Sequence, residues 1–348
     1  MEQGFPLLPA GCHLELDRQA QEIVLRSIRE AVPHRWSARV QALSALAQTH
    51  GPNLTLAHYL AHSGTTLDEV YNGGKSWSDL RADAGLPVHP AGPIEAALRR
   101  ACGRLLHVDD APRIHAWKTL LQDLARLGGS GERNTALAAM LIAALFTRET
   151  LPSGASRADA LALLAQHPQV IEELLQLLDV LQERLAHLGF ALEVLPQVPL
   201  RVHARYTRAE ILAATGSSDR AVPAAWQTGV LWAESIRSDL LAFTLDKTDG
   251  RFSPTTRYRD YAINRELIHW ESQSVTRADS DTGLRYQRHA QQGSHILLFA
   301  RLRVPGPFLF LGPARYVSHQ GEQPMAITWR LHHPLPGDVY AEFAAAVA

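Results

Sequence analysis

His269, Glu271 and Gln273 alternate along the stretch ELIHWESQSV, whose residue types favour a β-strand. Strand side chains point to opposite faces in turn. These three hydrogen-bonding groups would therefore share one face, with Trp270 and Ser272 on the other. A histidine and a carboxylate on one face can act as an acid–base pair, or they can bind a ligand by hydrogen bonds. They can also form the solvated side of an ordinary sheet. All three interpretations stay open, because shifted pKa values cannot be recognised in a sequence.

Arginine and tyrosine interleave just before that stretch, in RFSPTTRYRDYAINR. The residues concerned are Arg251, Arg257, Tyr258, Arg259, Tyr261 and Arg265, with Asp260 as the one opposing charge. Guanidinium groups bind phosphate, and aromatic rings can stack on an exposed base. The alternative is a solvated sheet edge, where both residue types are common. The segment is a candidate nucleic-acid contact, and the residues alone leave the two interpretations balanced.

The other motifs predict no enzyme chemistry. YNGGKS resembles the end of a phosphate-binding loop, but that motif needs a glycine where this chain has Glu69. We expect a helix cap and a turn there instead, after a short helix that Thr66 and Glu69 begin as a capping box. The sequence has no HExxH, no Cys/His cluster and no GxSxG. No catalytic residue, metal ligand or cofactor is therefore predicted.

Composition predicts an ordinary folded protein. Of the 348 residues, 46 % are hydrophobic and 20 % charged, and the net charge of −1 gives no overall basic field. The cysteines Cys12 and Cys102 suggest a reducing cytoplasm, not a disulfide scaffold. The N-terminus has no basic region followed by a long apolar run, which argues against a signal peptide. The apolar run at 136–146 is too short to cross a bilayer. We expect a cytoplasmic protein with no membrane contact.

Two halves with different patterns follow one another along the chain. Residues 1–200 are rich in alanine and leucine at helical spacing and predict a helical bundle, with a possible internal break near 87–93 or 127–134. Residues 201–348 have one short helix, YTRAEILAATG, in which Thr207 and Glu210 are spaced as a capping box. Runs with period two, separated by turns, follow it. The expected class is α+β, with an antiparallel sheet or small β-barrel after the helices.

Several blocks of the second half resemble, in order, the DUF3427 family. They are YTRAEILAATG, FSPTTRYRDYAINRELIHWESQS, ADSDTGLRYQRH, HILLFAR and FLFLGPARYVSHQGEQPMAITWRL. That region lies at the C-terminus of bacterial superfamily 2 helicases. LPAGCHLELDRQAQEIVL and LDEVYNGGKSWSDLRADAGL are similar to the helical segment that follows the motor in those proteins.

The resemblance implies a module without its motor. Some family members are modification-dependent (type IV) restriction enzymes of phage defence, whose C-terminal region is thought to read modified cytosine in an SRA-like or PUA-like barrel. A helicase motor and a nuclease, in cis or in trans, are then the expected partners, together with DNA. Two positions depart from the family pattern. This chain has Leu302 where relatives tend to have glutamate, and Glu271 where they often have glutamine.

The leading hypothesis is a non-catalytic, helicase-associated DNA-binding module that flips a modified cytosine out of the duplex. Tyr258, Tyr261 or Trp270 would stack on the base, and Asp260, Ser272 and Gln273 would bind its edge. Arg251, Arg257, Arg259 and Arg315 would hold phosphates. The further candidates are His269, Tyr316, Ser318 and His319. Two rival hypotheses are a hydrolase that uses His269 and Glu271, and a coupler that docks a partner through a leucine-rich helix such as Val170–Leu185.

Overall fold

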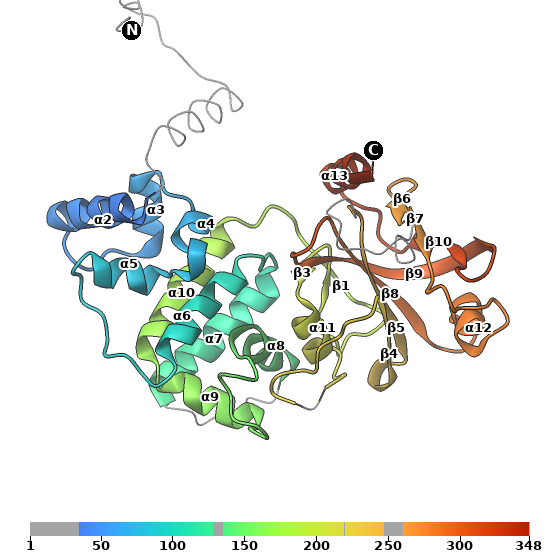
Figure 1. Cartoon of the computed structure of the whole chain (residues 1–348), viewed down its shortest axis with the longest axis horizontal. Coiled ribbons are helices and arrows are strands. Elements are labelled where there is room, and N and C mark those ends of the chain that lie inside the picture. The colour runs from blue at the N-terminus through green and yellow to red at the C-terminus, as the bar shows by residue number, and fades with distance from the viewer. Residues whose placement is uncertain (1–34, 128–134, 219, 247–259, 348) are drawn as a thin grey trace, which may run out of the picture.

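The computed structural model describes residues 35–127, 135–218, 220–246 and 260–347. A helical half and a half built around a β-sheet lie side by side (Figure 1). The predicted α+β class is confirmed. Within the described residues, no helix has the length and apolar character that crossing a membrane requires.

The helical half is built around one long helix. Its helices are α2 (Trp36–His50), α3 (Leu56–Ser63), α4 (Leu67–Val70), η1 (Asn72–Gly74), α5 (Trp77–Asp83), α6 (Glu95–Cys102), η2 (Gly103–Leu105), α7 (Ala111–Leu127), α8 (Ala136–Leu145), α9 (Arg157–Ala165) and α10 (Pro168–Glu183). The last of these, α10, contacts α3 and α5 as well as α6, α7 and α9. It therefore joins the helices on both sides of residues 87–93.

The YNGGKS segment is the helix cap and turn that was predicted. Thr66 and Glu69 form a capping box at the start of α4, and Ser76 caps α5. Gly73 and Gly74 lie between them with φ values of 66° and 73°. Glycine adopts this left-handed region without the steric cost that a Cβ brings, so the two glycines permit the tight turn between the helices.

The second half adds three α-helices, one short 3-10 helix and ten strands among the described residues. Its elements are β1 (Phe190–Ala191), β2 (Arg201–Val202), β3 (Arg205–Tyr206), α11 (Arg208–Ala214), β4 (Val230–Ala233), η3 (Glu234–Ile236), β5 (Ser238–Thr244), β6 (Tyr261–Ala262), β7 (Leu267–Glu271), α12 (Asp281–Arg288), β8 (His295–Arg301), β9 (Phe308–Gln320), β10 (Ala326–Leu331) and α13 (Gly337–Val347). The main sheet has the order β4-β5-β8-β9-β10-β7-β6, and β3 pairs with β9.

The expectation of an antiparallel, barrel-like sheet needs correction. Strands β5 and β8 run parallel, so the sheet is mixed. The edge strands β4 and β6 do not pair with each other among the described residues, and no closed barrel forms. Between β5 and β8 the chain passes through β6, β7 and α12 before it returns beside β5. A crossover of that length is what a parallel pair requires, and the strand patterns alone did not reveal it.

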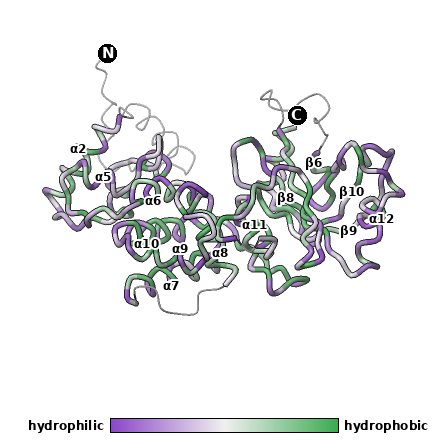
Figure 2. The backbone as a smooth tube through the Cα atoms, turned by 60° about the horizontal axis from the view of Figure 1, so that its bottom comes forward, coloured by the Kyte–Doolittle hydropathy of each residue, from purple (hydrophilic) through white to green (hydrophobic). Residues whose placement is uncertain are grey.

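The sheet has an apolar core on each side. In β5, Leu240 and Ala242 belong to the core shared with the helical half, whereas Leu241 and Phe243 belong to a second core under α12 and α13. The shared core runs without a break from α2 through α10 into the sheet. Helix α8 packs on α11 where the halves meet, and Figure 2 shows these two helices next to each other. The helices thus fix the position of the sheet by a common core.

Candidate nucleic-acid interface

Strand β7 has the alternation predicted for ELIHWESQSV. Leu267, His269 and Glu271 are half-buried, whereas Ile268 and Trp270 are buried. His269 and Glu271 therefore lie on one face of the strand, as expected. The cause is the pleat of the strand, because the opposite face packs against the core under α12 and α13.

Trp270 lies on the wrong face to stack on a ligand. Its ring packs edge-on against Tyr286 at 5.7 Å between centroids and lies 6.4 Å from the ring of Trp329. With 3 % exposure it is a core residue. A base could reach this ring only if the second core opened, so the stacking role proposed for Trp270 is not available in this fold.

A polar row crosses the outer face of the sheet, defined here as the face that carries His269. Tyr261 on β6 pairs with His269, which pairs with Thr328 on β10, which in turn pairs with Ser318 on β9. The rings of Tyr261 and His269 are stacked, with centroids 4.7 Å apart and an angle of 24°. Tyr261 is 37 % exposed and Ser318 is exposed. Two of the predicted residues, Tyr261 and His269, are thus brought together as one accessible aromatic pair.

Two arginines flank this row. Arg330 on β10 lies opposite Arg315 on β9, and both are exposed. Among the described residues, one carboxylate forms an ion pair with these arginines: Glu266 lies 3.5 Å from Arg330. Like charges on directly opposed positions of a sheet repel each other. This part of the outer face therefore favours an anionic ligand.

Asp260 and Ser272 serve the backbone of the sheet. Asp260 is 5 % exposed and accepts a hydrogen bond from the Glu271 amide at 3.0 Å. The Ser272 hydroxyl accepts from the Met325 amide at 2.8 Å and donates to the Gln273 carbonyl at 3.2 Å. Neither side chain is presented on the outer face, whereas Gln273 is half-buried just beyond the end of β7. These contacts hold the end of the strand in register. The two side chains therefore bind backbone groups and not the edge of a base.

Tyr316 and His319 lie on the inner side of β9. The Tyr316 hydroxyl lies 2.6 Å from His319 Nδ1, and its ring packs edge-on against Trp329. A register shift between Thr328 and Trp329 inserts one extra residue, Val317, between Tyr316 and Ser318. The bulge leaves Tyr316 facing Trp329 while Ser318 faces outward. The predicted set therefore divides between the two faces of the sheet.

Four predicted residues, Arg251, Arg257, Tyr258 and Arg259, lie outside the described residues. Arg265 is described, and its Nε donates to the Leu335 carbonyl at 2.7 Å before α13. In the part of the chain that the structure describes, no three His, Cys, Asp or Glu side chains form a group that could hold a metal ion.

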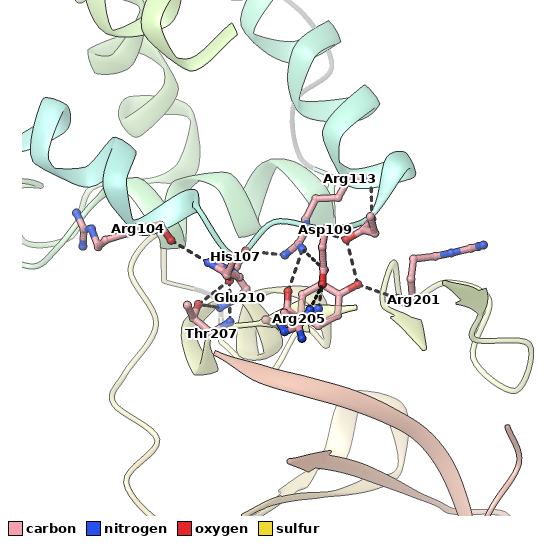
Figure 3. A network of polar contacts seen from close by, with 10 residues as sticks. Arg104, His107, Asp109, Arg113, Arg201, Arg205, Thr207 and Glu210 are labelled. Carbon is pink, nitrogen blue, oxygen red and sulfur yellow. Dashed lines mark hydrogen bonds and ion pairs between the residues drawn. The ribbon is translucent and has the colours of Figure 1, made fainter. Parts of the chain in front are cut away.

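A buried ion network, which the sequence did not predict, joins the two halves (Figure 3). The fully buried Arg113 pairs with Asp110 at 2.8 Å and with Glu210 at 2.9 Å. It also donates to the Arg205 carbonyl at 2.9 Å. Arg113 and Asp110 come from the start of α7, whereas Arg205 and Glu210 come from the start of the second half.

Glu210 is the centre of this network. Besides Arg113 it contacts His107 Nε2 at 2.7 Å and accepts from the amide and hydroxyl of Thr207. Burial by itself raises the pKa of the Glu210 carboxyl. His107, Arg113 and the hydrogen bond from the Thr207 amide outweigh that effect and lower the pKa to about 2. The sequence predicted Thr207 and Glu210 as a capping box, which is confirmed. Nothing in that pattern indicated the partners across the junction.

Comparison with known families supports the resemblance in the second half. Residues 200–343 match the model of a domain of unknown function, DUF3427. No curated protein matches the chain. The matched region begins at β2 and ends in α13, so it includes the whole sheet and the Glu210 side of the junction.

Proposed function

We propose that the second half is a DNA-binding module that uses the outer face of β6, β7, β10 and β9, and that it reads a modified cytosine for a helicase and nuclease system. The observation that carries the proposal is the exposed Tyr261–His269 ring pair in one row with Thr328 and Ser318.

The chemistry of this row suits a nucleic acid. Stacked, partly exposed rings offer a surface on which a base can lie, and hydroxyls of threonine and serine can bind its edge. Arg315 on β9 and Arg330 on β10 lie next to the row on the outer face, and they would hold phosphates. The modified cytosine and the helicase and nuclease partners rest on the resemblance to DUF3427 proteins, and a flipped base is the form such a reader would bind.

The test is fluorescence anisotropy with the full chain and two duplexes that differ only in one 5-methylcytosine, over a salt series. We expect tighter binding of the methylated duplex. Tyr261→Ala should weaken it by about 1–3 kcal/mol, the cost of losing one stacked base. The double variant Arg315→Gln, Arg330→Gln should reduce the salt slope by about 2, since each phosphate contact contributes about 0.9.

Arg148→Gln is the matched control, because Arg148 is an exposed arginine of the helical half. It should leave both affinity and salt slope unchanged. Equal affinity for the two duplexes would leave DNA binding and remove modified-cytosine reading. Negligible affinity for both at low salt would remove the whole proposal.

A second candidate function is hydrolysis of a nucleic acid, since His269 and Glu271 lie on the same half-buried face of β7. The variant His269→Ala, Glu271→Gln separates the two functions. Cleavage of labelled DNA, with divalent metal supplied, that disappears in the variant would favour the enzyme. Wild-type protein that binds DNA and leaves it intact would favour the reader.

A further inference from the structure

A cavity of about 560 Å³ lies at the far end of β9 from the outer-face row. Its walls come from the end of β8, the following loop, the start of β9 and the last turns of α13. Leu302, Leu309 and Phe343 form an apolar side. Arg205, Arg301 and Arg303 supply three guanidinium groups, and Glu342 supplies a carboxylate.

The three arginines differ in how their charge is balanced. Arg205 pairs with Asp109 at 2.9 Å, and Arg303 pairs with Asp246 at 2.7 Å. Arg301 has no carboxylate partner among the described residues. Its Nε donates to the Thr244 hydroxyl at 2.9 Å, and the Gly306 carbonyl lies at 3.4 Å from one terminal nitrogen. Both of these acceptors are neutral.

A second cation lies close to Arg301. The guanidinium carbons of Arg301 and Arg208 lie 4.5 Å and 5.3 Å from the centre of the Phe308 ring. Arg208 donates to the Trp226 carbonyl and likewise has no carboxylate partner in the described part of the chain. Burial and, after it, repulsion by Arg208 lower the pKa of Arg301 to about 10. A buried charge without a counter-charge costs free energy, which a bound anion would offset.

We infer that this cavity is a binding site for a phosphate group, held by Arg301 with Arg303 and Arg205 at its rim. The planar fork of a guanidinium matches the oxygens of a phosphate, and Arg301 offers one whose charge no described carboxylate balances. The apolar side formed by Leu302, Leu309 and Phe343 would receive the organic part of a phosphate ester. The site lies apart from the outer-face row and does not depend on the function proposed for it.

The phosphate can belong to a small ester or to the end of a nucleic acid strand. The probes are dCMP, its nucleoside deoxycytidine, inorganic phosphate, and one oligonucleotide with and without a 5′-phosphate, all at constant ionic strength. Isothermal titration calorimetry on the full chain measures each affinity. We expect dCMP to bind at least tenfold more tightly than deoxycytidine. A preference for the 5′-phosphorylated oligonucleotide assigns the site to strand ends, and binding of dCMP alone assigns it to a small ester.

Two variants with opposite expected effects on dCMP affinity test the residues of the cavity. Arg301→Gln should weaken dCMP binding at least tenfold, and Glu342→Gln should tighten it about threefold, because an exposed carboxylate no longer repels the phosphate. Arg303→Gln alters an exposed side chain and keeps the test valid if the Arg301 variant folds poorly. The control Arg148→Gln changes an exposed arginine of the helical half and should bind dCMP like wild type.

Two results would overturn the inference. One is a wild-type protein that does not distinguish dCMP from deoxycytidine or the phosphorylated oligonucleotide from its counterpart. The other is unchanged dCMP affinity in both Arg301→Gln and Arg303→Gln. Neither result affects the DNA-binding proposal, whose variants lie at Tyr261, Arg315 and Arg330.

Discussion

Arg113 at the junction and Arg301 in the cavity are the same residue type in opposite situations. Arg113 is fully buried and contacts three carboxylates and a carbonyl of its own chain. Arg301 is half-buried, and the hydrogen bonds that it makes among the described residues go to neutral oxygens. A guanidinium whose partners lie within the chain stabilises the fold. A guanidinium that lacks a counter-charge leaves its positive charge unbalanced, and an anionic ligand can balance it.

Aromatic residues repeat the same contrast within one short stretch. Trp270 packs into the second core, whereas Tyr261 stacks on His269 at the surface. The two rings face opposite sides of the same sheet. Residue type therefore marks a candidate, and the side of the sheet on which it lies decides whether it can contact a ligand.

The largest expected effect is at Arg113. Arg113→Ala should lower the free energy of unfolding by about 3–5 kcal/mol, because Asp110 remains buried without its counter-charge and Glu210 keeps only His107 as a counter-charge among the described residues. Arg301→Ala should change it by about 1 kcal/mol or less in the absence of ligand. Urea unfolding of both variants measures the difference. Similar losses of unfolding free energy in the two variants would contradict the contrast between Arg113 and Arg301. The variant Arg148→Ala is the control for removal of an exposed arginine.

The aromatic contrast gives a second prediction. Trp270→Ala should cost about 3–5 kcal/mol of unfolding free energy, because a large buried ring leaves a cavity. Tyr261→Ala should cost roughly 0.5 kcal/mol, as expected for an exposed position. Chemical denaturation of the two variants side by side measures both values. A Tyr261 variant as unstable as the Trp270 variant would mean that the outer-face pair is structural.

The pH dependence of stability gives a third prediction, with an effect somewhat below those at Arg113 and Trp270. The pKa of Glu210 is about 2 in the folded chain, against the ordinary 4.5. Between these values the unfolded chain binds more protons, so stability falls as pH falls through this range. The contribution is on the order of 3 kcal/mol, fully present above pH 4.5 and lost by about pH 2.

Denaturant midpoints from pH 5.5 to 3 should therefore decline more steeply in wild type than in Glu210→Gln, which lacks the titrating group. Parallel curves for the two proteins would show that the junction carboxyl does not carry this linkage.

Much of the secondary structure could be predicted because it depends on local patterns. The capping boxes at Thr66 and Thr207 and the alternation in β7 were correct, since each depends on residues a few positions apart. The helices α12 and α13 and the strand β4 were not predicted. Gly283, a poor helix former, lies in the first turn of α12, and β4 spans only four residues. The parallel pairing of β5 and β8 depends on how a long crossover returns to the sheet, which no local pattern specifies.

For the candidate site, the sequence alone determined which residues share a face. Strand period placed His269 with Glu271 and opposite Trp270, because the pleat requires it. Only the tertiary structure decided which face is open. The second core covers Trp270, and neighbouring strands bring Tyr261, Thr328 and Ser318 to His269. The cavity around Arg301 and the network around Arg113 were equally hidden. Each depends on charges that lie far apart in the chain, and folding decides which of them find a partner.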